Sequence, residues 1–243
     1  MPKNKKALLI VIVCVLIIIA VCASLYWLMN HRDFQLAGKI VSRVETNRKV
    51  VALTFDDGPT DKTPQILKIL DELGVKCTFF LTGRQIEENP GFTRAIAQAG
   101  HQIGNHSYSH ERMIFKSKAF IDSEIDTTNS LIRETGYEGE IVFRPPYCKK
   151  LLLLPAALEE RGMITVTCDT EPESQLAGGS AAIAEYALEH AHEGSIILLH
   201  VMYDSTHASL GALPRIVNGL REKGYDFVTI NELLALCSDD LPR

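Results

Sequence analysis

Two adjacent carboxylates, Asp56 and Asp57, follow directly on a run of apolar and β-branched residues and precede a Gly-Pro turn. The run from Val50 to Phe55 has the length and composition of a buried strand, so the two acids stand at its carboxyl end. Side chains alternate along an extended chain, and the two carboxylates therefore point in different directions. This arrangement allows one acid to bind a metal ion while the other handles a proton.

Two histidines, His106 and His110, come about fifty residues later and offer the ligands that such a metal site lacks. Because they are four residues apart, we expect both imidazoles on one side of a helical turn, where they reach one cation together with a carboxylate. Three protein ligands leave open positions for water and substrate. The alternative is a solvated Asp-Asp-Gly-Pro turn with two unrelated histidines, and the further motifs weigh against it.

Two later segments complete a set of four motifs along the chain. The set consists of Thr54 to Pro59, His106 to His110, Arg144 to Tyr147 and Leu198 to His200. In this order they resemble the motifs of the NodB-type polysaccharide deacetylases, which form carbohydrate esterase family 4. The resemblance extends over roughly residues 48 to 236, and four motifs in the right order make it specific.

The alternation of apolar strands with amphipathic helices predicts an α/β protein with a parallel sheet covered by helices. Asp56, Arg144, Asp169 and His200 each follow directly on a predicted strand, and closure into a barrel would bring them together over one rim. The resemblance implies a deformed (β/α) barrel of the NodB-homology type, with fewer than eight regular strands. Periodicity alone does not separate this barrel from an open doubly wound sheet.

The resemblance further implies a hydrolytic metal site in which Asp57, His106 and His110 hold a divalent cation. A cation there lowers the pKa of bound water and polarises the acetyl carbonyl. Zinc is the first expectation for two histidines and one carboxylate, and cobalt, nickel or manganese fit the same ligands. Asp56 is then expected to take the proton from the attacking water.

Three residues outside the metal site also receive roles from the resemblance. His200 is expected to protonate the leaving nitrogen as general acid, although a lone histidine at a strand end is more often structural. The backbone N–H of Tyr147 is expected to donate to the oxyanion, and Arg144 to orient Asp56. The alternative for Arg144 is a surface salt bridge. The two prolines between Arg144 and Tyr147 stiffen the loop, which suits a fixed amide donor.

Two positions depart from the family pattern. Cys148 stands where glycine usually follows the motif tyrosine. A further motif of the family lies between the third and the last of the four motifs and is commonly Asp-x-x-Asp-Trp. Here it reads Asp169-Thr170-Glu171-Pro172-Glu173, with Glu173 in place of the tryptophan. Asp169 remains and is expected to tune His200 through a hydrogen bond. The aromatic wall that should pack against the sugar is missing, so we expect an altered substrate preference.

The N-terminal part of the chain contains 23 consecutive uncharged residues, from Ala7 to Met29. At about 1.5 Å per residue, this run is long enough to cross a bilayer core of about 30 Å. The lysines in residues 1–6 predict a cytoplasmic basic tail, residues 7–29 a transmembrane anchor, and the remainder a part outside the cell. A cleaved signal peptide, which would release the protein, is the alternative. Its apolar core of about 7 to 15 residues is usually shorter than this run.

Residues 30–47 are polar and mixed, and they indicate a short stalk or edge segment before a single catalytic domain at 48–243. Acidic residues outnumber basic ones, 30 to 25, and the absence of a basic stripe argues against a nucleic-acid partner. Cys77 and Cys168 lie inside predicted strands and are expected to be buried free thiols. The role and redox state of Cys148 stay open.

Together these features predict a membrane-anchored, metal-dependent polysaccharide N-deacetylase that faces the cell exterior. Peptidoglycan N-acetylglucosamine is the expected substrate, on the grounds of location and family. An O-acetyl ester hydrolase of xylan type uses the same chemistry and is one alternative. The other is a non-catalytic glycan-binding wall protein that kept the fold, against which the complete set of metal-ligand and proton-transfer residues argues.

Overall fold

The computed structural model describes residues 3–203, 205 and 207–239. Its central element is β2 (Val50–Asp56), a strand whose seven residues are all buried. In the parallel sheet, β4 (Gln102–Asn105), β3 (Thr78–Leu81), β2 and β6 (Ile196–Leu199) lie in that order, and the short β7 (Asp226–Phe227) pairs with the beginning of β2. Strands buried on both faces explain why the sequence of β2 is almost continuously apolar.

Isolated β-bridges extend this sheet into a ring. Asn105 at the end of β4 pairs with Phe143, and Phe143 pairs with Thr165 of β5 (Thr165–Val166), whose other neighbour is β1 (Ile40–Val41). Thr170 then pairs with Ile197 of β6. The expected deformed (β/α) barrel is therefore confirmed, with short strands and single bridges in place of a regular eight-stranded ring.

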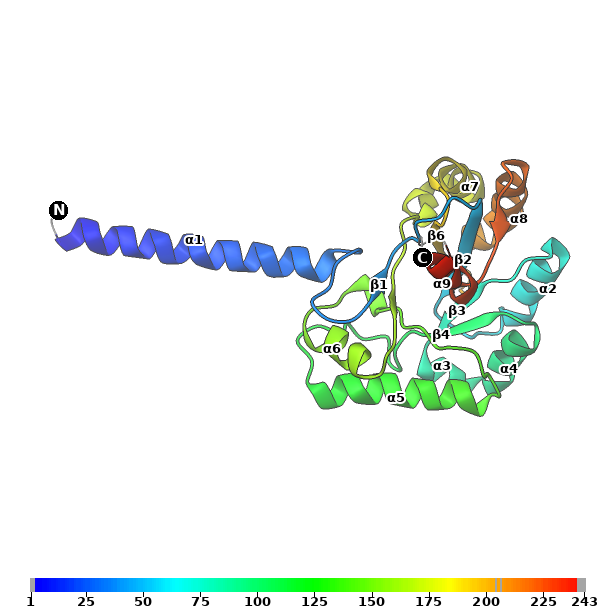
Figure 1. Ribbon diagram of the computed structural model, residues 1–243, viewed down its shortest axis with the longest axis horizontal. Helices are drawn as coiled ribbons and strands as arrows, with labels where there is room; N and C mark the ends of the chain where they lie inside the picture. Colours follow the sequence, from blue (N-terminus) through cyan, green and yellow to red (C-terminus); the bar gives the residue numbers. More distant parts are fainter. Residues whose placement is uncertain (1–2, 204, 206, 240–243) are drawn as a thin grey trace.

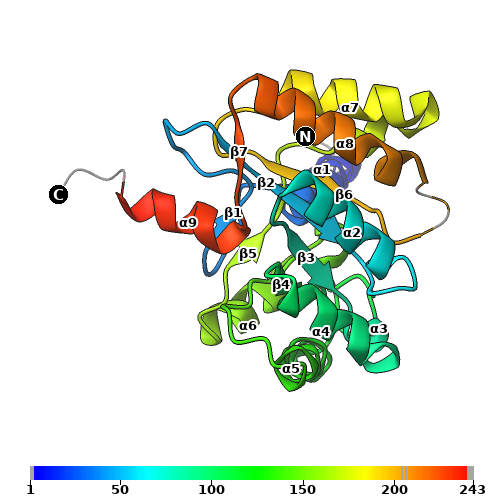
Figure 2. The ribbon, with the colours of Figure 1, turned by 90° about the vertical axis from the view of Figure 1, so that its right-hand side faces the viewer.

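Helices cover the outside of this ring, with α7 and α8 on one side and α4 and α5 on the opposite side (Figure 2). The helices that follow the N-terminal one are α2 (Thr63–Leu73), α3 (Gly83–Glu88), α4 (Pro90–Gln98), α5 (Lys118–Glu134), α6 (Leu153–Glu160), α7 (Gly179–His190), α8 (His207–Glu222) and α9 (Ile230–Asp239). Short 3-10 helices occur at Pro146–Cys148 and Pro172–Gly178.

Alternation along β2 decides which of its side chains reach the centre of the ring. Val51, Leu53 and Phe55 pack against the covering helices in the larger apolar core. Ala52 faces the other way, into a second core, and Thr54 and Asp56 follow on the same inner face. The strand thus delivers a carboxylate to the interior at its carboxyl end, as its sequence predicts.

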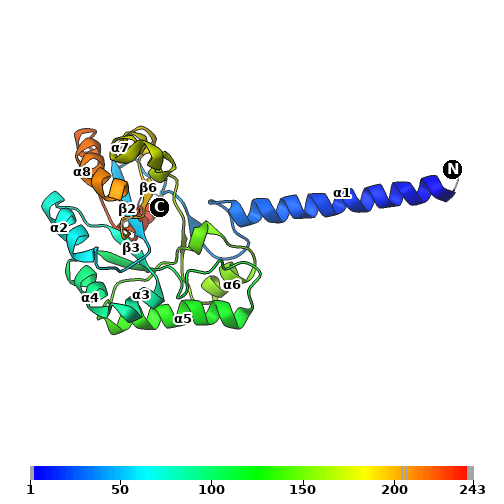
Figure 3. The same cartoon turned by 180° about the vertical axis from the view of Figure 1, so that it is seen from behind.

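The N-terminal helix α1 (Lys3–Asn30) projects from the domain on the side of α6 and β1, away from α2 (Figures 1 and 3). Its residues Lys6–Asn30 form a candidate membrane span. The most apolar stretch of this span has a mean hydropathy of 3.5, and the domain buries none of it. Length and composition of this kind fit both an anchor and a signal sequence.

Residues 30–47 lie along the edge of the ring and not on a free stalk, which is one of the two arrangements expected from their composition. β1 pairs with β5 as an edge strand. Val44 is 3% exposed and belongs to the inner core, and its amide donates a hydrogen bond of 3.0 Å to the carbonyl of Gly194. A mixed, polar composition concealed the few apolar residues that attach this segment to the ring.

The contact between Val44 and Gly194 generates a first prediction. A Cβ on Gly194 would lie 1.8 Å from the Val44 carbonyl oxygen, whereas one on Gly162 meets no atom within 4 Å, and both glycines have positive φ (+76° and +65°). We expect Gly162→Ala to cost about 1–2 kcal/mol of unfolding free energy, for the backbone conformation alone. Gly194→Ala should cost about 1–3 kcal/mol more, because Val44 must move.

Urea unfolding of the detergent-solubilised full chain measures both variants. Equal losses of stability in the two would show that residues 42–46 do not pack against Gly194 in solution.

Candidate active site

A pocket of about 390 Å³ lies at the carboxyl ends of the central strands, and most of the predicted site residues line it. They come from separate loops that the ring brings together. Arg144 lies beneath this pocket, whereas Asp169 lies outside it, as described below. The lining residues are Arg32, Asp56, Asp57, His106, His110, Tyr147, Cys148, Glu171, Leu198 and His200.

Arg144 is fully buried, with 0% of its surface exposed, and it binds the end of β2. Its Nη1 donates to Asp56 Oδ1 at 2.6 Å and to Thr54 Oγ1 at 2.9 Å, and its Nη2 donates to the Thr167 carbonyl at 3.0 Å. The guanidinium also lies over the Phe80 ring, 3.9 Å from its centroid. The ion pair is therefore not on the surface, which excludes that alternative, and Arg144 makes the contact with Asp56 that its expected role requires.

The same contact keeps Asp56 ionised. Burial by itself raises the pKa of the Asp56 carboxyl, but favourable interactions, of which the charge of Arg144 is the largest, outweigh burial and hold the pKa below its usual value. Asp56 Oδ1 is engaged by Arg144, while Oδ2 lies 3.7 Å from His106 Nε2. A carboxylate in this state has one oxygen directed toward the pocket and can accept a proton there.

Asp57, His106 and His110 direct their ligand atoms at one point. His110 Nε2 lies 3.5 Å and His106 Nε2 3.9 Å from Asp57 Oδ1, and one ligand atom from each residue falls within 4.8 Å of the others. Donor atoms bound to one tetrahedral zinc ion at about 2.0–2.2 Å stand about 3.3–3.6 Å apart, so the His110 separation matches and the other donors need to approach by small side-chain movements. Asp57 reaches this position because its φ of +71° turns the chain directly after the strand.

The charge states of these three groups fit a cation. Burial lowers the pKa of both the His106 and the His110 imidazole, which favours the neutral, coordinating form. Burial also raises the pKa of Asp57, and the neighbouring Asp56 adds to this effect. A bound cation would act in the opposite direction and favour the ionised carboxylate. His106 Nδ1 lies 2.7 Å from the Arg144 carbonyl, which leaves Nε2 for the metal. A buried carboxylate beside two neutral imidazoles is a donor set that a divalent cation completes.

The two histidines do not share a helical turn, which corrects the expectation drawn from their spacing. His106 follows β4 directly, and the chain to His110 is a loop in which Ser107 and His110 have positive φ (65° and 59°). Glu124 Oε2 accepts the amides of residues 108 and 109, at 3.0 and 2.8 Å. Asn105 Oδ1 accepts the Ser107 amide at 2.8 Å. These hydrogen bonds bring both imidazoles to one side without a helix.

His200 has a different partner from the one expected. Its Nδ1 lies 2.5 Å from Glu173 Oε2, and its amide donates to Glu173 Oε1 at 2.6 Å. Asp169 instead accepts hydrogen bonds from Ser195 Oγ at 2.7 Å and from the Ile196 amide at 2.8 Å, at the opposite end of β6. The expected hydrogen bond between Asp169 and His200 is therefore wrong, because a short 3-10 helix carries Glu173 back over the strand end.

Glu173 changes the charge state of His200. Burial by itself lowers the pKa of this imidazole, but the hydrogen bond to Glu173 and the charges of Asp56, Glu173 and Asp57 raise it to about 9. His200 is therefore protonated at neutral pH and can donate a proton into the pocket. The residue that stands in place of the family's tryptophan thus binds the predicted acid and does not form a wall for the sugar.

Tyr147 and Cys148 form one edge of the pocket with unusual backbone conformations. Both have positive φ (57° and 54°), which explains why glycine suits the position after the tyrosine. The Tyr147 ring is 55% exposed and packs 4.8 Å from the His110 ring. The Cys148 thiol is buried and free. A hydrogen bond with Cys168, assisted by the charges of Arg144 and Arg32, lowers its pKa to about 7.

Several residues of the site carry no sequence signal that marks them. Arg32 lines the pocket and forms an ion pair of 2.5 Å with Glu171. Gln85 Oε1 accepts the Gly58 amide at 2.8 Å and supports the loop after Asp57. Glu124 and Asn105 hold the histidine loop, as described above. Arg32, Gln85 and Glu124 act through contacts distant in sequence, so only the departure at Glu173 was visible beforehand.

The polysaccharide deacetylase family model matches residues 43–166. A peptidoglycan-N-acetylglucosamine deacetylase of Bacillus cereus is 30% identical over 212 residues, which cover 85% of this chain and 98% of that protein. A bifunctional xylanase/deacetylase of Pseudobutyrivibrio xylanivorans is 34% identical over 194 residues, or 78% of this chain. The chain spans only 31% of the length of that relative.

Solved structures give the same match. The Bc1960 peptidoglycan N-acetylglucosamine deacetylase superposes with a TM-score of 0.75 at 32% identity, over 79% of this chain and 91% of that one. A carbohydrate esterase family 4 pseudoenzyme from Bacillus anthracis, BA3943, superposes with a TM-score of 0.74 at 29% identity, over 82% of this chain and 70% of that one. The fold is thus shared by a deacetylase and by a protein described as a pseudoenzyme.

The donor geometry predicts one tight divalent site per chain. We expect His110→Ala to weaken zinc binding at least about 100-fold, because one of three ligands is lost. His190→Ala, which removes a largely exposed histidine bonded to the Tyr186 carbonyl, should leave zinc binding unchanged. Metal content after dialysis and competition with a chromogenic chelator measure both variants, and an equal effect in the two would contradict the assignment.

Proposed function

Because this chain belongs to the polysaccharide deacetylase family, we propose that it hydrolyses the N-acetyl groups of peptidoglycan N-acetylglucosamine with the help of a bound divalent metal ion. Zinc is the metal that we propose, since two imidazoles and one carboxylate suit it best. The activity as a hydrolase of carbon–nitrogen bonds follows from the family, while the sugar and the metal are specific to this proposal.

One observation supports the proposal above all others. An ionised carboxylate, Asp56, and a protonated imidazole, His200, line the same pocket as the three-ligand set. Hydrolysis of an amide needs a base for the attacking water and an acid for the departing amine, and two groups whose pKa values are pushed apart meet both needs at neutral pH. A surface cluster would not bury a carboxylate paired with Arg144 in the same pocket as an imidazole bonded to Glu173.

The residues divide the work as follows. Asp57, His106 and His110 hold the cation, which supplies Lewis acidity and lowers the pKa of water. Asp56 accepts the proton of the attacking water, while Arg144 keeps its carboxylate ionised and oriented. The backbone N–H of Tyr147 donates to the oxygen of the acetyl carbonyl as negative charge develops there.

His200 then protonates the nitrogen of the leaving amine. Glu173 holds this imidazole in place through Nδ1 and through the backbone, so that Nε2 is the atom that donates. Asp169, which contacts Ser195 and Ile196, supports the strand that carries His200 and has no direct part in proton transfer.

We further propose that α1 anchors the protein in the cell membrane as a single-pass helix with the domain outside. The candidate span of 25 residues, with Lys3 and Lys5 before it and Lys6 at its start, supports this orientation. Removal of α1 as a signal sequence would release the same domain, and the mass of the mature protein distinguishes the two cases.

Two other functions follow from specific comparisons. The xylanase/deacetylase relative at 34% identity makes an O-acetyl ester of xylan a second substrate to test. The pseudoenzyme neighbour makes a non-catalytic glycan-binding role the competing class, although the base, the acid and the three ligands are all present in this chain.

Acetate release from peptidoglycan and from N-acetylglucosamine oligomers tests the proposed activity. We expect release with added zinc, none after chelation, and at least a 100-fold lower rate for Asp56→Asn, because the base is lost while the ligands remain. The matched control is Asp71→Asn on the exposed side of α2, which should keep full activity.

Release from acetylated xylan alone would identify an esterase instead. Absence of release from every glycan by the zinc-loaded, folded protein, together with retained glycan binding, would favour the non-catalytic role.

The contact between Glu173 and His200 predicts a pH dependence. The general acid works only when protonated, so activity is present below the pKa of His200 and is lost as pH rises through about 9. Glu173→Gln removes the charge that raises this pKa, and we expect the alkaline limb of kcat/KM to move toward pH 6.5. Glu171→Gln removes a neighbouring charge without touching His200 and should leave the limb in place.

A further inference from the structure

Large apolar side chains that remain exposed are few outside α1, and they gather in two places. Among the described residues beyond Asn30, seven have more than a third of their surface exposed. Tyr147 lines the pocket, and Tyr203 is hydrogen-bonded to Gln85 beside it. The other five surround the carboxyl end of α1 and are called the collar here: Phe34, Leu36, Phe115, Leu152 and Leu153.

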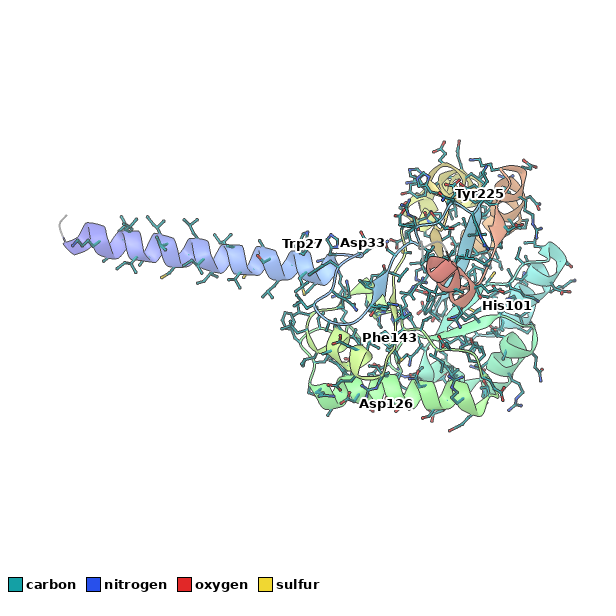
Figure 4. All side chains as sticks on the ribbon, viewed as in Figure 1. Trp27, Asp33, His101, Asp126, Phe143 and Tyr225 are labelled. Carbon is teal, nitrogen blue, oxygen red and sulfur yellow. The ribbon has the colours of Figure 1, made fainter. Side chains whose placement is uncertain are left out.

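Contacts on two sides of the helix define the collar. On one side, Leu25 borders a cavity together with Phe115, Leu152 and Leu153. On another, Trp27 and Leu28 border a cavity with Phe34 and Leu36, and the Trp27 and Phe34 rings lie 5.8 Å apart. The junction is marked by Trp27 and Asp33 in Figure 4, on the opposite side of the domain from His101. The collar therefore encircles the last turns of the proposed anchor.

The domain is attached directly to this end of the helix. Lys149 Nζ donates to Asn30 Oδ1, and Lys150 Nζ donates to the His31 carbonyl. Thr167 Oγ1 donates to the Arg32 carbonyl at 2.8 Å. Because residues 30–32 are bonded into the domain and no free stalk follows, the domain cannot move far from the point where α1 ends.

The catalytic pocket opens close to the same point. Arg32 lines the pocket, and it stands two residues after Asn30, a separation of at most about 7 Å along the chain. On the other side of the pocket, Tyr147 and Cys148 are followed within a few residues by Leu152 and Leu153 of the collar. The mouth of the pocket and the collar thus share one end of the domain.

The length of α1 brings the collar to the level of lipid headgroups. The 25 residues from Lys6 to Asn30 extend about 37 Å, whereas the hydrocarbon core is about 30 Å thick. The last turns of the helix therefore lie in the outer headgroup layer. Exposed apolar side chains at that level are stable in the interface. Arg112, which lies over the Tyr147 ring at 5.0 Å, adds a positive charge that suits lipid phosphates, whereas Lys116 is paired with Glu111.

We propose that the collar docks on the outer surface of the lipid bilayer, so that the pocket acts on N-acetylated glycan chains held at the membrane surface, such as chains still linked to a lipid. The continuity of the collar with α1 selects lipid as its occupant over a second copy or another protein. This proposal rests on the anchor and on the deacetylase activity proposed above. It adds that the substrate lies at the membrane surface. A domain on a long stalk could instead reach glycan chains at many distances from the membrane.

Quenching of a single tryptophan by lipid tests the docking. Trp27 is the only tryptophan of the chain, so Trp27→Phe gives a silent background for the full-length protein in vesicles. In that background Leu152→Trp should lose at least half of its fluorescence to lipids brominated near the headgroups. Lys68→Trp, an exposed site on α2 at the far side of the domain, should lose little.

Equal, weak quenching at both positions would overturn the proposal. So would a fluorescence of Leu152→Trp that depends on protein concentration in detergent, because that result would identify a second copy as the occupant of the collar.

A substrate comparison tests the consequence for the reaction independently. Acetate release is measured from a soluble N-acetylglucosamine oligomer and from the same oligomer carried on a lipid in the vesicle that holds the enzyme. We expect the lipid-linked oligomer to react at least about tenfold faster. The triple variant Phe115→Ser, Leu152→Ser, Leu153→Ser should lose this preference and keep its rate on the soluble oligomer, because these exposed residues do not touch the pocket ligands.

The two proposals fail in different ways. No acetate from either oligomer would refute the deacetylase activity, while the quenching result still decides whether the collar meets the bilayer. Release without any preference for the lipid-linked oligomer would refute the position of the substrate and leave the activity standing.

Discussion

A buried guanidinium is the constraint on which the active site of this protein depends. Arg144 has no exposed surface, and an unpaired charge there would cost several kcal/mol. Asp56 must therefore be ionised, and the bonds from Arg144 to Thr54 and to the Thr167 carbonyl hold the guanidinium in one position. The carbonyl of the same arginine contacts His106 Nδ1 and leaves Nε2 toward the ligand set. One residue thus prepares both the base and a metal ligand.

Buried or partly buried acids on neighbouring elements extend this organisation to the loops. Glu124 of α5 fixes the histidine loop through two amides, and Glu173 fixes His200 through a ring nitrogen and an amide. Loops held by charge-assisted hydrogen bonds lose little entropy when substrate binds. The pocket is consequently preorganised although it consists almost entirely of loops, which is the usual way in which barrel folds build their sites.

The position of the pocket relative to α1 connects this chemistry to the membrane. Residues 30–36 connect α1, the ring and the site. Their first residues form hydrogen bonds with residues 149, 150 and 167 of the domain, and Arg32 lines the pocket. If the collar docks on the bilayer as proposed, the packing of this segment also fixes the distance of the pocket from the membrane surface.

The sequence by itself predicted the α/β class, the anchor-like helix and, through its motifs, the candidate metal ligands Asp57, His106 and His110 that the fold brings together, because apolar periodicity and short motifs are local. Only the tertiary structure decided that His106 and His110 meet through a loop, that Glu173 and not Asp169 binds His200, and that residues 30–47 join the ring. Each of these depends on contacts between segments far apart in the chain, such as Glu124 with the loop 107–110 and Val44 with Gly194. Spacing along the chain does not indicate which distant carboxylate or carbonyl will contact a given residue, because the distances between such groups are set by the closure of the ring.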